Sequence, residues 1–114
     1  MHVPEGAQPK EGPSSGVAIV TALVSALTAN PVKKQVAMTG EITLRGRILA
    51  IGGLKEKLLG AIRAGIKTVF IPNENKNDLT EMPDNVTSSL NIILVSHIEE
   101  VLNGALVNPV KKTN

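Results

Sequence analysis

The chain enters its first apolar segment through residues 9–16, which read Pro9-Lys10-Glu11-Gly12-Pro13-Ser14-Ser15-Gly16. Glycine and proline at this density indicate a turn, and Pro13 suits the first turn of a helix. A hydroxyl in such a turn is exposed, and the first N–H groups of the helix lack intrahelical partners. The segment therefore predicts a serine nucleophile, with those amides as candidate oxyanion donors.

The two serines of this turn also have a simpler explanation. Serine is favoured at the N-cap of a helix, where its side-chain oxygen accepts a backbone hydrogen bond. Ser14 and Ser15 are rivals for both roles, because either one could cap the helix while the other attacks. Helical periodicity does not separate them.

A candidate general base lies in residues 52–57, which read Gly52-Gly53-Leu54-Lys55-Glu56-Lys57. Lys57 falls near the first turn of a predicted helix, but Lys55 lies nearer the centre of its apolar stripe, so spacing alone does not choose between them. A lysine that deprotonates serine needs a pKa lowered from about 10.4 to about 7 or 8, which requires an apolar environment. Thr39 could hold the amine by a hydrogen bond, or it could simply be a strand residue.

The remaining pattern predicts an α/β fold. The apolar face of the helix from Ser14 to Thr28 contains Val17, Val20, Leu23, Val24 and Leu27, and we expect this helix to be packed on two sides. The other predicted elements are strands at 35–39 and 42–51 with Gly46 as a turn or bulge, a helix at 54–64, a strand at 67–72, a helix at 74–82, a strand at 91–96 and a helix at 97–106. Residues 1–106 are expected to form one domain and residues 107–114 a disordered tail.

Composition excludes several classes of function. The 114 residues are 42% hydrophobic and 19% charged, with a net charge of +2, no cysteine and one aromatic residue, Phe70. Disulfides, thiol catalysis and base-stacking platforms are therefore excluded, and the dispersed charge does not imply a nucleic-acid partner. His2 and His97 offer no metal cluster, and His97 is expected to cap the last helix or lie on the surface rather than serve a Ser-His-Asp triad. No stretch has the roughly 20 apolar residues of a membrane span.

Several segments together resemble the C-terminal proteolytic domain of Lon, the ATP-dependent serine protease family, from His2 to about Leu106. They are Pro4-Glu5-Gly6-Ala7, residues 9–16, Met38-Thr39-Gly40-Glu41-Ile42, residues 52–57, Ile71-Pro72-Asn73-Glu74-Asn75-Lys76 and Ile98-Glu99-Glu100-Val101-Leu102. The resemblance implies a mixed sheet with packed helices, incomplete at its N-terminus because the first strands of that domain are expected to be missing.

The resemblance also assigns roles to individual residues. It implies that Ser14 is the nucleophile and Lys57 the general base of a Ser-Lys dyad, and that Thr39 hydrogen-bonds the lysine amine. Glu11 matches an acidic position, often aspartate, beside the serine. Ser15 stands where the family usually has alanine.

The family's biology gives further expectations. The implied reaction is hydrolysis of peptide bonds in unfolded or regulatory proteins, in protein quality control, coupled to an AAA+ ATPase module. That module is absent from this chain, which has no G-x-x-x-x-G-K-[ST] segment, so ATP and Mg²⁺ are implied only for the missing module and no cofactor is expected here. The resemblance further implies a homo-hexamer in the bacterial cytoplasm, or alternatively in the mitochondrial matrix, with no membrane partner.

Two alternatives stay open. The chain could be a catalytically silent Lon fragment that only folds or associates with a complete subunit. It could instead bind phosphate or a nucleotide, because a Gly/Ser turn at a helix N-terminus also binds anions, as in the Gly-Ser-Ser loops of galactokinase- and mevalonate kinase-type enzymes. The second alternative leaves the Lys-Glu-Lys segment unexplained.

Overall fold

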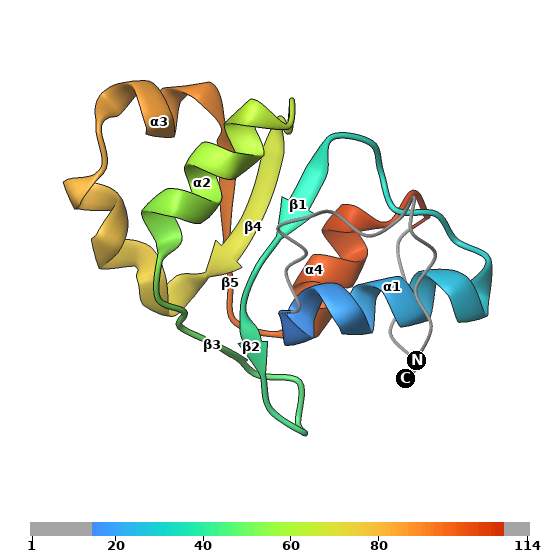
Figure 1. The fold of residues 1–114 in the computed structure, drawn as a ribbon. Coiled ribbons are helices and arrows are strands. Elements are labelled where there is room, and N and C mark those ends of the chain that lie inside the picture. The colour runs from blue at the N-terminus through green and yellow to red at the C-terminus, as the bar shows by residue number, and fades with distance from the viewer. Residues whose placement is uncertain (1–14, 109–114) are drawn as a thin grey trace.

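The computed structural model describes residues 15–108, which form an α/β fold as predicted (Figure 1). The elements in chain order are α1 (Gly16–Thr28), β1 (Val36–Met38), β2 (Glu41–Ile42), β3 (Ile48–Leu49), α2 (Leu54–Arg63), β4 (Thr68–Pro72), the 3₁₀ helix η2 (Asn73–Glu81), α3 (Asp84–Ser89), β5 (Asn91–Val95) and α4 (Ile98–Ala105).

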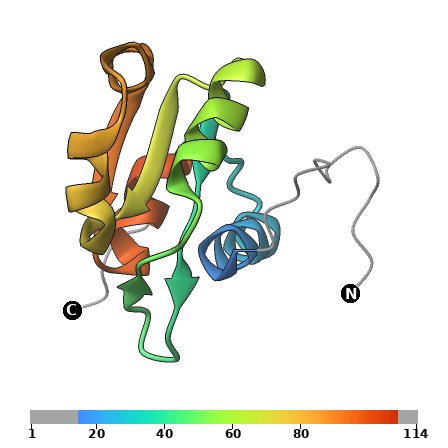
Figure 2. The same ribbon diagram turned by 60° about the vertical axis from the view of Figure 1, so that its left-hand side comes forward.

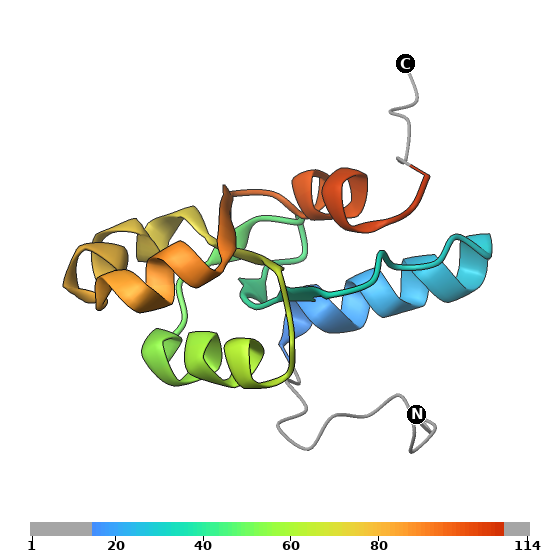
Figure 3. The same cartoon turned by 90° about the horizontal axis from the view of Figure 1, so that it is seen from above.

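A parallel three-stranded sheet in the order β1-β4-β5 forms the centre of the fold. Successive side chains of a strand point to opposite faces, so Val69 and Ile71 of β4 join the core beneath α2 and α3, while Phe70 joins the core beneath α4 and α1. Viewed from above, α2 and α4 lie on opposite sides of the strands (Figure 3). Both faces are covered, as parallel sheets require.

The second quarter of the chain is predicted to contain strands at residues 35–39 and 42–51, with Gly46 as a turn or bulge, in a hairpin-rich section. The turn at Gly46 and a hairpin are confirmed, but the strand at residues 35–39 is not part of that hairpin. Instead β1 pairs with β4, and the next segment folds back on itself, with β2 antiparallel to β3 and Gly46 at φ +88° in the turn between them. The N–H of Thr39 donates to the carbonyl of Phe70 at 3.0 Å, so the chain continues along β4 beyond the end of β1. Gly40 thus leads away from the sheet rather than into a tight hairpin.

Helix α1 is confirmed, but its predicted packing on two sides is wrong. Val17 and Thr21 are buried, whereas Leu23 is 43% exposed and Leu27 is 84% exposed. Figure 2 shows α1 beside the sheet, next to the β2–β3 hairpin, rather than across a sheet face. The helix therefore contacts the rest of the described chain along one side.

The C-terminal part of the fold confirms the predicted strand at β5 and corrects two details. His97 caps α4 as expected, since its ring nitrogen accepts from the N–H of Glu99 while Glu100 reaches back to complete a capping box. The short helix α3 was not predicted. The disordered tail expected over residues 107–114 does not begin at Val107. The N–H of Val107 donates to the carbonyl of Pro31, and the N–H of Asn108 donates to the Asn30 side chain. Residues 109–114 lie outside the described residues. Among residues 15–108 no helix has the length and apolar character needed to cross a membrane.

Candidate functional site

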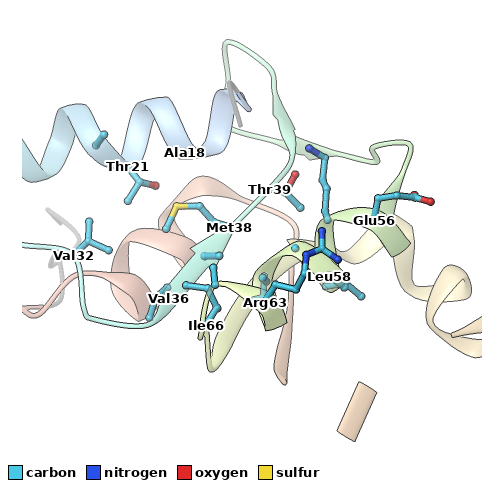
Figure 4. A pocket seen from close by; sticks show the side chains of 17 residues that line it. Ala18, Thr21, Val32, Val36, Met38, Thr39, Glu56, Leu58, Arg63 and Ile66 are labelled. Carbon is cyan, nitrogen blue, oxygen red and sulfur yellow. The ribbon is translucent and has the colours of Figure 1, made fainter. Parts of the chain in front are cut away.

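A cavity of about 620 Å³ lies between α1, β1 and α2, at the edge of the sheet formed by β1 (Figure 4). Its walls are mainly apolar and come from all three elements, with Ala18 on α1, Val36 and Met38 on β1, and Leu58 on α2. We call it the α1–β1–α2 cavity. A concave apolar site with a few polar groups is the usual form of a ligand or substrate site.

The structure distinguishes the two candidate lysines. Lys57 lies in the first turns of α2, as predicted, and lines the α1–β1–α2 cavity together with Glu56 and Arg63. Lys55 is exposed and is not among the described residues that line the cavity. The helix begins after Gly53, whose φ of +70° lets the chain turn sharply out of the preceding loop. Both lysines are exposed, so their position relative to the cavity is what separates them.

Thr39 lies at the end of β1 and lines the same cavity as Lys57. Its side chain is 5% exposed, and its Oγ1 has no hydrogen-bond partner among the described residues; the same is true of Thr21 on α1. An unpartnered buried hydroxyl costs roughly 1–3 kcal/mol, so such groups call for an explanation. The hydrogen bond expected between Thr39 and the Lys57 amine is not formed, and the Lys57 side chain is exposed.

The start of α1 is held against the corner between β1 and β2. The N–H of Val17 donates to the carbonyl of Gly40 at 3.1 Å. A Cβ atom on Gly16 would lie 2.5 Å from Ile42 Cγ2, so glycine is needed for this close approach. Gly40 directly follows Thr39, and this corner therefore brings the first turn of α1 next to the Thr39 end of the cavity.

The structure gives a role to one of the two serines of the opening turn. Ser15 is the N-cap of α1, because its Oγ accepts from the N–H of Ala18 at 3.1 Å. Ser14 and Glu11 lie outside the described residues. The expected use of the first helical amides as oxyanion donors is wrong for Val17 and Ala18, since both N–H groups already have partners within the fold.

Two residues near the site were missed by sequence reasoning. Thr21 has no signal beyond its place in the predicted helix. Asn75, which is 2% exposed and bonded to the loop before α2, lies inside a segment quoted for its resemblance, but no single-sequence pattern marks a buried amide. Within residues 15–108 no group of three or more metal-ligating side chains is gathered.

Comparison with known proteins agrees with this fold and with the motifs. Residues 1–108 match the model of the Lon protease (S16) C-terminal proteolytic domain. The chain is 68% identical over 108 residues to the Lon protease of Escherichia coli strain K12, covering 95% of this chain and 14% of that protein. It is 64% identical over 107 residues to the Lon protease of Brucella abortus biovar 1, covering 94% of this chain and 13% of that protein.

A third relative gives the same result. The Lon protease of Vibrio parahaemolyticus is 67% identical over 106 residues, which cover 93% of this chain and 14% of that protein. The chain thus spans about one seventh of the length of the relatives it matches. With a family match over almost its whole length and relatives at this level of identity, the chain belongs to the Lon protease C-terminal proteolytic domain family.

Proposed function

We propose that this chain carries the Ser-Lys dyad of a serine endopeptidase, with Ser14 as nucleophile and Lys57 as general base. One observation carries the proposal: Lys57 and Thr39 line a single cavity whose third wall is α1, the helix that begins two residues after Ser14 in the sequence. The capping role of Ser15 supports the choice of Ser14, because the Ser15 hydroxyl already has a structural contact.

The proposed reaction proceeds through an acyl-enzyme. The neutral Lys57 amine accepts the Ser14 hydroxyl proton as Oγ attacks the peptide carbonyl carbon. The C–N bond of the peptide then breaks, and the Lys57 ammonium returns the proton to the leaving amine. Water repeats the sequence on the acyl-serine and restores the free hydroxyl. Because the Val17 and Ala18 amides have partners, the proposed reaction requires oxyanion donors other than these two.

Thr39 has a proposed role in the same site. Its buried Oγ1 lacks a partner, and an ammonium or amine is the donor that such an oxygen could accept. We propose that the Lys57 side chain moves from its exposed position onto Thr39 when the site is assembled. Burial against the apolar cavity wall would then disfavour the charged amine, as general-base chemistry near neutral pH requires.

The function of the whole protein is also a proposal, since this chain is a small share of its relatives' length. We propose that it works as part of a homo-hexamer whose AAA+ ATPase modules, with ATP and Mg²⁺, deliver unfolded or regulatory proteins. The proposed compartment is the bacterial cytoplasm, with the mitochondrial matrix as the alternative. Glu11 is proposed to be the acidic neighbour of the nucleophile. The family match favours this interpretation over the phosphate-binding alternative.

Reaction with a serine-directed fluorophosphonate, followed by peptide-mapping mass spectrometry, tests the dyad. We expect one adduct, on Ser14, that is lost in Ser14→Ala and falls by about 10²-fold or more in rate in Lys57→Ala. Lys55→Ala is the matched control and should label at close to the unchanged rate. An adduct on Ser15, or loss in Lys55→Ala with retention in Lys57→Ala, would overturn the assignment. A folded chain that gives no adduct would support the silent-fragment alternative.

A further inference from the structure

The loop that leads into α2 is held from the side by the buried amide of Asn75. The Oδ1 atom of Asn75 accepts from the N–H of Ile51 at 3.0 Å, and its Nδ2 atom donates to the carbonyl of Ile51 at 2.9 Å. The same Nδ2 donates to Asp78 Oδ2 at 2.7 Å. Asn75 is 2% exposed, so these contacts form away from water and satisfy both ends of the amide.

A second side chain of η2 holds the neighbouring residue of that loop. Glu74 accepts from the N–H of Ala50 at 3.0 Å and from Arg47 Nη2 at 3.1 Å. These contacts lower the pKa of the Glu74 carboxyl, through the Ala50 hydrogen bond first and then through Arg47. Two adjacent residues of η2 therefore fix two successive residues of the loop, and we call this pair of contacts the η2 clamp.

The clamp matters because of what lies between it and Lys57. Gly52 and Gly53 are the only residues between Ile51 and the first residue of α2. Glycine has the widest choice of backbone conformation, and no atom lies within 4 Å of where a Cβ on Gly52 would be. The backbone alone therefore does not set the direction in which α2 leaves the loop. The burial of Leu54 fixes one side of this junction, and the clamp fixes the other.

We propose that Asn75, supported by Glu74, is a positioning residue that sets the origin of α2 and thereby the place of Lys57 in the α1–β1–α2 cavity. The inference rests on the proposed role of Lys57 as general base. Proton transfer needs the base within hydrogen-bond reach of the nucleophile, and small displacements of catalytic groups cost large factors in rate. A residue that only stabilised the fold would have no such effect on the reaction.

The test uses Asn75→Asp, which keeps the shape and the acceptor for the Ile51 N–H but removes the donor to the Ile51 carbonyl. The matched control is Val101→Ala, a buried change in α4 on the opposite face of the sheet. Backbone residual dipolar couplings report the orientation of α2 relative to β4 and β5, and fluorophosphonate labelling reports the reactivity of Ser14. Both are measured on the complete chain at a temperature where each variant is folded.

We expect Asn75→Asp to change the α2 couplings relative to the sheet and to slow Ser14 labelling by about ten-fold or more, with an altered pH profile. Val101→Ala should leave both unchanged. Unaltered α2 couplings in Asn75→Asp, or α2 movement without any change in labelling, would overturn the positioning role, as would equal effects in the control. If the unsubstituted chain does not label, the dyad fails, and the couplings alone decide whether the clamp sets α2.

The Asp78 contact provides a further check. The double change Asn75→Asp with Asp78→Asn restores a donor between these two side chains but not the donor to the Ile51 carbonyl. We expect the double variant to keep the slow labelling of Asn75→Asp. Full recovery would assign the effect to the contact within η2 and would contradict positioning through Ile51.

Discussion

Helices α1 and α2 form two walls of the same cavity, yet they are held in different ways. Helix α2 buries one face along its length, with Leu54 4%, Leu58 1% and Ala61 8% exposed, and the η2 clamp holds the loop before it. Helix α1 is buried in its first half, at Val17 and Thr21, and Val24 also packs against the core, while Leu27 near its end is 84% exposed. The candidate base therefore stands on a helix whose buried residues run from Leu54 to Ala61, and the candidate nucleophile precedes a helix whose fully buried residues lie in its first half.

The difference extends to the way in which the start of α1 is placed. The contacts that place its start are local: the Ser15 cap, the close approach of Gly16 to Ile42 and the hydrogen bond from Val17 to Gly40. The corner of the chain at Gly40 thus places the start of one wall of the cavity, whereas a buried helix face and the η2 clamp place the other.

The largest expected effect compares one leucine from each helix. Leu58→Ala should destabilise the chain by about 2–5 kcal/mol, because it removes packed methyl groups and leaves a cavity beneath α2. Leu27→Ala should change stability by less than about 0.5 kcal/mol, since this side chain is already exposed. Urea unfolding followed by circular dichroism measures both. Equal losses would mean that α1 is buried in solution.

The next comparison involves the glycine at the anchor of each helix. Gly40→Ala should cost about 2–4 kcal/mol, because its φ is +146° and a Cβ would lie 2.8 Å from Ile48 Cγ2 and 3.0 Å from Val17 Cγ2. Gly53→Ala should cost about 1 kcal/mol from its left-handed conformation alone, since the nearest atom to the new Cβ is 3.9 Å away. Thermal unfolding of the two variants gives the difference, and a larger loss at Gly53 would reverse the ranking.

Sequence reasoning predicted most elements but not how they pair. The helix after residue 15 and the helix after His97 begin with capping signals that act within four residues, so they are readable locally. The β1–β4 pairing joins residues far apart in sequence and leaves no turn signal between them. For the same reason the sequence could suggest Lys57 by resemblance but could not reveal Asn75, whose role depends on contacts with Ile51.

A smaller effect is expected from the cap of α1. Ser15→Ala should cost about 1 kcal/mol, because it leaves the N–H of Ala18 without its side-chain acceptor. The change should leave fluorophosphonate labelling of Ser14 in place if Ser15 serves only as the cap. Calorimetric unfolding and labelling of the same sample measure the two roles separately. Loss of labelling without loss of stability would transfer the nucleophile to Ser15.

The smallest effect concerns Glu74 and pH. A carboxyl whose pKa is lowered by folding adds stability at pH values above its ordinary pKa, and that contribution disappears as the pH falls through the lowered value. Glu74→Gln should therefore lose slightly more stability at about pH 6 than at about pH 3. Urea midpoints across this range, with Glu81→Gln as an exposed control on η2, measure the difference. A variant that parallels the unsubstituted chain at every pH would show that Arg47 and Ala50 do not act on Glu74.

The central place of β4 has a consequence for how this chain acquires its structure. Val36 of β1 pairs with Thr68 of β4, and Thr68 pairs with Asn91 of β5. Each strand pairing in the main sheet therefore joins residues that are far apart in the sequence and closes a long loop. Folds dominated by such distant pairs fold more slowly than those built from neighbouring segments. Among the strands of residues 15–108, β1 has its sheet partner only after β4 has been made during synthesis, and β4 pairs along its second edge only when β5 follows. Helix α1 can form early, whereas β1 can pair with β4 only after β4 has been made.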